Sequence, residues 1–224
     1  MARKFPNKGL KGTTGRPSPG LIPAKPKIVI VCEGKVTEPR YFNDFTDHHG
    51  NSLVTVTTIG GCGVPLCVVE RAVREKHALT HTARRSKDSY DQQFDVWAVF
   101  DRDAHPKPQV PQAFALAKRH GIRIAFSNPC FELWGLMHFT CVARPGSHKQ
   151  TQRELKRLLP RFCHEKNPIL DFDVLIPKYT QALSNATQAL KDRELEGQTN
   201  GDPSTTVFRL TEQIRQFGKS QPVL

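Results

Sequence analysis

The chain has 224 residues, of which 38% are hydrophobic and 24% charged, and its formal net charge is +12. This composition is typical of a globular protein and excludes a largely disordered chain, and no apolar run approaches the ~20 residues that a membrane-spanning helix needs. The positive charge favours polyanionic partners, above all nucleic acid, because Lys and Arg displace the counterions that condense on phosphates.

The first 26 residues are rich in Pro, Gly and basic residues and have no hydrophobic periodicity, which predicts a flexible basic arm. Seven Lys and Arg and no acidic residue occur in the first 27 residues. The apolar segment of a secretory signal does not follow them, so we expect a cytoplasmic protein without a membrane partner. The folded part that remains is basic by itself, since residues 28–224 carry a net charge of +5.

Residues 27–143 alternate between strand and helix patterns. The first strand is an unbroken apolar run, as in strands that are buried on both faces of a parallel sheet. Four such alternations predict an α/β domain with a mostly parallel four-stranded sheet flanked by helices. The expected strands are 28–32, 53–59, 94–100 and 122–127, with a glycine turn at 60–63, and the expected helices are 38–47, one from Pro65, one from Pro111 to the C-cap Gly121, and one from Cys130.

Residues 144–224 have the composition of a helical C-terminal part that packs on this domain. One predicted helix ends at Pro160 and has an apolar stripe of Leu155, Leu158 and Leu159. Two further amphipathic helices are expected around their own apolar stripes. These stripes are Ala182, Leu183, Ala186 and Leu190, and then Val207, Leu210, Ile214 and Phe217.

Acidic residues follow two of the predicted strands. Glu33 comes directly after the first strand, and Asp101 and Asp103 come after the third. The carboxyl ends of parallel strands meet at the sheet edge where ligands gather, and crowded carboxylates repel one another unless a cation joins them. We therefore expect Mg²⁺ or Mn²⁺ there, with Glu38 and Glu132 as further ligands. Such ions hold phosphodiesters and activate water in nucleases and polymerases.

Four sequence blocks carry a resemblance to a known family. They are VCEGKVTEPRYF, VFDRDAH, SNPCFELWGLMHF and NGDPSTTVFRL, in this order. Glu-Gly after the first strand with Asp-x-Asp after the third resembles the TOPRIM domain of topoisomerases, bacterial primases and OLD-family nucleases. Over about residues 27–215 the chain is most similar to the RloB-like branch of TOPRIM proteins, which are encoded near restriction and other phage-defence genes.

This resemblance implies a metal-dependent nuclease with a TOPRIM-type fold. It makes Glu33 the general acid or base, Asp101 and Asp103 the Mg²⁺ ligands, and Glu132 the later carboxylate of nuclease-type sites. Glu38 corresponds to the second acidic position of the first motif. The spacing from Glu33 to Glu38 is one residue longer than is usual in OLD proteins, which leaves the metal role of Glu38 open.

Basic residues near these motifs are candidates for nucleic-acid binding. Lys149, Arg153 and Arg157 are spaced by four and share one helix face, which is either a phosphate-binding or a solvated surface. Lys35 and Arg102 stand beside the two acidic motifs and are further candidates. Contacts to the backbone carry no base information, so the residues do not distinguish DNA from RNA.

Plain structural roles compete with these assignments. In this interpretation Glu33 and Gly34 form a solvated turn, and Asp101 or Asp103 caps the segment that follows the third strand. His105 and His138 would then be packing residues rather than catalytic ones. The six cysteines form no CxxC pair, and His138, Cys141, Cys163 and His164 lack zinc spacing, so we expect buried free thiols, with a zinc site as the alternative.

The function predicted from all of this is Mg²⁺-dependent cleavage of DNA or RNA, including tRNA, in phage defence. The chain has no Walker A motif, so any ATP-driven control needs a separate ATPase partner. The first alternative is a non-catalytic nucleic-acid-binding adaptor of such an ATPase complex. A phosphatase with an Asp-x-Asp nucleophile ranks last, because that motif normally follows the first strand. The sequence does not fix the oligomeric state.

Overall fold

The computed structural model describes residues 25–58, 64–102 and 109–218, and the structural statements below concern these residues. Most of the predicted basic arm and the glycine turn at 60–63 lie outside them. So do Asp103 and His105. No helix in the described ranges is long and apolar enough to cross a membrane.

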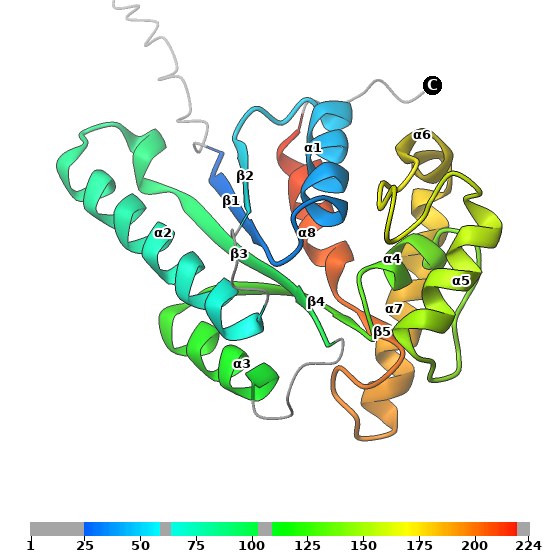
Figure 1. Cartoon of the computed structure of the whole chain (residues 1–224). Coiled ribbons are helices and arrows are strands. Elements are labelled where there is room, and N and C mark those ends of the chain that lie inside the picture. Colours follow the sequence, from blue (N-terminus) through cyan, green and yellow to red (C-terminus); the bar gives the residue numbers. More distant parts are fainter. Residues whose placement is uncertain (1–24, 59–63, 103–108, 219–224) are drawn as a thin grey trace, which may run out of the picture.

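A five-stranded sheet forms the centre of the molecule (Figure 1). Its order is β2-β1-β3-β4-β5, and the strands are β1 (Lys27–Cys32), β2 (Val54–Thr58), β3 (Phe94–Asp101), β4 (Arg123–Asn128) and β5 (Ser204–Thr205). The first four strands are parallel and β5 is antiparallel to β4. The predicted α/β fold is confirmed. The sheet has five strands rather than the expected four, because a two-residue segment of the C-terminal part pairs with β4.

Helices cover both faces of the sheet, as predicted (Figure 1). On one face lie α2 (Pro65–Arg85) and α3 (Gln109–His120), and on the other lie α1 (Thr37–His49) and α8 (Val207–Phe217). The short helix η1 (Ser89–Gln92) precedes β3. The remaining helices gather beside the sheet near the end of β4 (Figure 1): α4 (Glu132–Met137), α5 (His148–Leu158), α6 (Phe172–Leu175), η2 (Ile176–Lys178) and α7 (Tyr179–Leu195).

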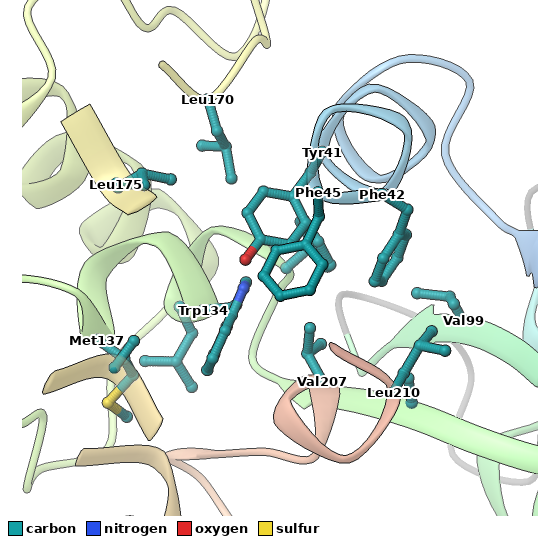
Figure 2. Packing of buried hydrophobic residues seen from close by; sticks show 14 of the residues in the cluster. Tyr41, Phe42, Phe45, Val99, Trp134, Met137, Leu170, Leu175, Val207 and Leu210 are labelled. Carbon is teal, nitrogen blue, oxygen red and sulfur yellow. The ribbon is translucent and has the colours of Figure 1, made fainter. Parts of the chain in front are cut away.

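The two faces of the sheet bury different side chains. Alternate residues of β1 enter opposite cores, as the period of two in a strand requires. The core under α2 and α3 is mostly Val and Ala with a few Phe rings. The larger core is aromatic and joins α1 to α4 through Tyr41, Phe45 and Trp134 (Figure 2).

The C-terminal part contributes to this same aromatic core. Val207 and Leu210 of α8 are fully buried against the sheet (Figure 2). The Trp97 indole N–H donates to Gln213 Oε1 at 2.7 Å, which ties α8 to β3. Residues 144–218 therefore share one core with the preceding domain.

Helix α5 is rotated differently from the predicted apolar stripe. Leu155 and Leu159 are buried, but Leu158 is 41% exposed, so its place in the stripe was wrong. The helix ends at Leu158, two residues before Pro160, as predicted. This rotation decides which basic residues of α5 face a neighbouring groove.

Candidate functional site

A cavity of about 310 Å³ lies at the carboxyl ends of β1 and β3. Four of the five predicted carboxylates line it together, and the fifth, Asp103, lies outside the described residues. The cavity is lined by Glu33, Gly34, Lys35, Val36, Thr37, Glu38, Asp101, Phe131, Glu132, His164 and Pro168. The expectation that the strand-end and helix-start acids meet at one edge is confirmed for these four.

The strand ends position Glu33 and Asp101. The backbone N–H of Glu33 donates to Val99 O at 3.0 Å, which continues the β1–β3 ladder by one residue. The backbone N–H of Asp101 then donates to Glu33 Oε2 at 3.4 Å. The N–H of Phe131 donates to Asp101 Oδ2 at 3.3 Å. These hydrogen bonds to the backbone fix both side chains. Both residues are half-buried and line the cavity.

Glu38 is held by the turn that precedes its helix. It stands in the first turn of α1 and is only 7% exposed. The N–H of Gly34 donates to Glu38 Oε1 at 3.2 Å. A Cβ atom at Gly34 would lie 2.0 Å from Glu38 Oε2, so only glycine admits the carboxylate at this place. Burial raises the pKa of Glu38, and the negative charge of Glu132 raises it further.

Glu132 is the most buried of the four carboxylates, with 3% exposure at the start of α4. The His164 ring lies with Nδ1 at 2.6 Å from Glu132 Oε1. Gln152 Nε2 of α5 donates to the same oxygen at 3.3 Å. The C-terminal part thus supplies two polar groups that hold this carboxylate.

Sequence reasoning missed both of these groups. Gln152 was not considered, and His164 was weighed only as a zinc ligand. His164 belongs to a segment between Pro160 and Asn167 that has no hydrophobic period, so no pattern placed it at the cavity. The one signal in the sequence was that His164 directly follows Cys163, which makes the two residues possible zinc ligands.

The donor types of the cavity fit the predicted cation. Carboxylate oxygens are the ligands that Mg²⁺ and Mn²⁺ prefer, and the mutual repulsion seen in the pKa of Glu38 is what a cation relieves. In the described ranges, however, no three His, Cys, Asp or Glu side chains are grouped as a preformed metal site. Glu38 and Glu132 are instead hydrogen-bonded to the protein itself.

The predicted nucleic-acid-binding residues lie in different places. Lys35 is exposed and lines the carboxylate cavity. Arg102 lines a separate cavity of about 280 Å³. Lys149 and Arg153 line a groove of about 730 Å³ beside α5, whereas Arg157 is exposed but does not line it.

The expectation of buried free thiols holds for Cys32 and Cys130 but is wrong for Cys141, which is exposed, and for Cys67 and Cys163, which are only partly buried. None of the described cysteines forms a disulfide, and Cys32 and Cys130 are buried thiols whose pKa burial raises. His138 is 1% exposed, and its pKa is lowered to about 4 because burial disfavours the charged ring.

Comparison with known proteins assigns the chain to a family. A family model described as RloB-like protein matches residues 28–214. The chain belongs to the RloB-like protein family. The resemblance to RloB-like proteins inferred from the four sequence blocks is thereby confirmed, and the matched range includes the cavity and α5 of this RloB-like chain. Comparison with curated proteins and with solved structures found no match.

Proposed function

We propose that this RloB-like protein is a Mg²⁺-dependent nuclease of the TOPRIM type that hydrolyses phosphodiester bonds of DNA or RNA. The observation that supports this most is the convergence of Glu33, Glu38, Asp101 and Glu132 on one cavity at the carboxyl edge of a parallel sheet. Carboxylates from three separate stretches of the chain, residues 33–38, Asp101 and Glu132, meet there, which a solvated turn or a helix cap does not require.

The position of each residue at the cavity suggests its role in the proposed reaction. Asp101 and Glu132, with Asp103, are the proposed ligands of the cation, and Glu38 is a further ligand. A bound Mg²⁺ would polarise the phosphoryl oxygen and lower the pKa of a water molecule. Glu33 is the proposed general acid or base, since its Oε2 is oriented by the Asp101 N–H and its side chain faces the cavity. Lys35 is placed to attract a phosphate.

His164 and Gln152 orient Glu132 in this proposal. Their hydrogen bonds hold the carboxylate while it is buried, in the way that outer residues fix the ligands of a metal. We call them positioning residues, because they act through Glu132.

The cellular role follows from the family resemblance alone. We propose that the protein acts in phage defence and that a separate ATPase subunit controls it. The chain has no Walker A motif, so ATP-dependent control would come from that partner.

The test is cleavage by Glu33→Gln. Glutamine keeps the shape and an oxygen that accepts from the Asp101 N–H, but it cannot transfer a proton. We expect cleavage of labelled DNA or tRNA pools in Mg²⁺ or Mn²⁺ to fall by about 10² or more, while binding is kept. Glu70→Gln, the same change at an exposed position of α2, is the matched control. The assay is run with and without the proposed ATPase partner, and undiminished cleavage by Glu33→Gln would refute the catalytic role.

One observation favours a non-catalytic adaptor as the second candidate. Glu38 and Glu132 already have partners within the protein, as expected of structural carboxylates. If the wild-type protein binds nucleic acid and its ATPase but never cleaves in either metal, the adaptor function replaces the nuclease.

A further inference from the structure

A groove runs along the exposed side of α5, next to the carboxylate cavity. Its volume is about 730 Å³. It lies between α5 and the segment that follows Pro160, and its lining is polar and basic. The lining residues are His148, Lys149, Gln152, Arg153, Lys156, Phe162, Cys163, His164 and Glu165.

The cations of this groove are available to a ligand. In the part of the chain that the structure describes, no carboxylate forms an ion pair with Lys149, Arg153 or Lys156. Arg153 Nε donates to the Lys149 carbonyl oxygen at 3.3 Å, a backbone contact that leaves the charge of the guanidinium uncompensated. The groove therefore presents three guanidinium or ammonium groups against one acidic residue, Glu165.

A second cavity shows what a neutralised groove looks like in the same molecule. The cavity of about 460 Å³ beside α1 is also lined by two arginines, Arg40 and Arg161. These pair with Asp44 and Asp171, which line the same cavity. The two surfaces differ in net charge, so of these two the α5 groove is the one suited to an anion.

The packing of α5 selects the residues that face the groove. Leu155 and Leu159 bury one side of the helix, and the segment after Pro160 lies along one flank, so that Lys149, Arg153 and Lys156 on this flank line the groove. Arg157 points away from the buried leucines and does not line the groove. Lys149 and Lys156 are seven residues apart, which is roughly 10 Å along the axis at about 1.5 Å per residue. This span covers more than one phosphate, so the ligand is an elongated polyanion.

The groove and the carboxylate cavity have a residue in common. His164 lines both, and its side chain is 54% exposed while Nδ1 lies against Glu132. Gln152 also lines the groove and donates to Glu132. A polyanion in the groove therefore ends beside the buried carboxylates.

We propose that the α5 groove binds the sugar–phosphate backbone of one nucleic-acid strand and leads it to the carboxylate cavity. Binding in the groove stands by itself, whereas the delivery of a scissile bond to the cavity rests on the proposed nuclease function. Lys156 is the cation that this assignment adds, and Arg157 is the neighbour that it leaves out.

The test compares two adjacent residues of one helix. Full-length Lys156→Gln and Arg157→Gln lose the same charge at exposed positions, and Lys149→Gln/Arg153→Gln/Lys156→Gln removes all three groove cations. Each protein is titrated into fluorescein-labelled single-stranded DNA and RNA of about 20 nucleotides, in EDTA, from about 50 to 300 mM salt. The basic arm is the same in every variant, so differences report the groove.

We expect the triple variant to lower the slope of log K against log salt by about 2 and to weaken binding roughly 100-fold at 0.1 M salt, at about 0.7 log units per contact. Lys156→Gln should lower the slope by about 0.7, while Arg157→Gln leaves it unchanged. If the triple variant binds as tightly as the wild type, or if Lys156→Gln and Arg157→Gln have equal effects, the groove is not the binding site. Displacement of the strand by AMP at an equal phosphate concentration would reduce it to a single-phosphate site.

The two proposals fail in different ways. If the triple variant binds normally while Glu33→Gln still abolishes cleavage, the groove is wrong and the nuclease stands. If the triple variant loses binding but the wild-type protein cleaves nothing, the groove stands and the nuclease is wrong.

Discussion

The four carboxylates of the cavity form two pairs that the fold holds in different ways. Glu33 and Asp101, at the strand ends, are half-buried and accept hydrogen bonds from backbone N–H groups. Glu38 and Glu132, at the helix starts, are 7% and 3% exposed. Glu38 depends on the absence of a side chain at Gly34, and Glu132 depends on His164.

This difference in burial predicts different roles for the two pairs of carboxylates. A half-buried carboxylate on a rigid strand end reaches the cavity without a large desolvation penalty, so it is suited to bind a cation or move a proton. A buried carboxylate needs satisfied hydrogen bonds, because an unpaired buried charge costs several kcal/mol. Substitutions in the strand-end pair should therefore affect chemistry with little loss of stability, whereas those around the helix-start pair should lower stability in addition to any effect on the proposed cation.

The largest effect should come from Asp101→Asn. Asparagine still accepts from the Phe131 N–H, so the fold is kept, but the ligand charge is lost. Since a cation contributes several kcal/mol to such reactions, cleavage should fall by about 10² or more. Calorimetric titration with Mn²⁺ should show less heat than for the wild type. Asp173→Asn, at an exposed position of α6, is the control, and equal Mn²⁺ heat for both variants would remove the cation from this strand end.

The next effect concerns α4, which begins with Glu132 at the cavity and ends beside His138 in the core. The pKa of His138 is lowered to about 4 by burial, below the 6.5 of an exposed histidine. Between these values the unfolded state binds more protons than the folded state, so stability is lost as the pH falls from 6.5 towards 4. The loss should reach about 3 kcal/mol in total.

Denaturant unfolding at several pH values measures this loss. The variant His138→Gln should have a flatter stability profile over the same pH range, because glutamine does not titrate. An identical profile for wild type and variant would show that His138 does not govern the acid limb. Mn²⁺ is left out, so that the measurement reports the core alone.

The smallest effect should come from Gly34→Ala. The added Cβ would lie 2.0 Å from Glu38 Oε2 and must displace the carboxylate from the Gly34 N–H. Loss of a hydrogen bond to a buried charged group should lower the free energy of unfolding by about 1 to 3 kcal/mol. Gly146→Ala is the control, because its Cβ would meet Gln150 Oε1 at an ordinary 3.6 Å. In a Glu38→Ala background the effect of Gly34→Ala should shrink, and an undiminished effect would mean that Glu38 is not its cause.

Much of the sheet and of the cavity could be predicted from the sequence. Apolar runs marked β1, β3 and β4, and turn and cap residues such as Gly121, with φ +61, marked helix ends. Because parallel strands share one carboxyl edge, Glu33 and Asp101 could be placed together without coordinates. Local pattern and sheet topology were sufficient to place a residue wherever it directly follows a strand.

The rest depends on tertiary packing that leaves no local pattern. Strand β5 has two residues and no alternation, so no period reveals it. Residues 153, 156 and 157 all satisfy helical spacing from Lys149, and only the packing of residues 162–165 along one flank of α5 selects Lys156 for the groove. His164 reaches Glu132 from 32 positions away through an irregular segment.

Residues 204–217 complete both an edge and a face of the sheet (Figure 1). Until they leave the ribosome, β4 keeps an open edge of backbone donors and acceptors, and the aromatic face above Trp97 stays uncovered. Open edges pair with other chains, and contacts between such distant segments form slowly. The nascent chain therefore exposes this edge and this face while residues 129–203 are being synthesised, and it is most prone to pair with other chains during that interval.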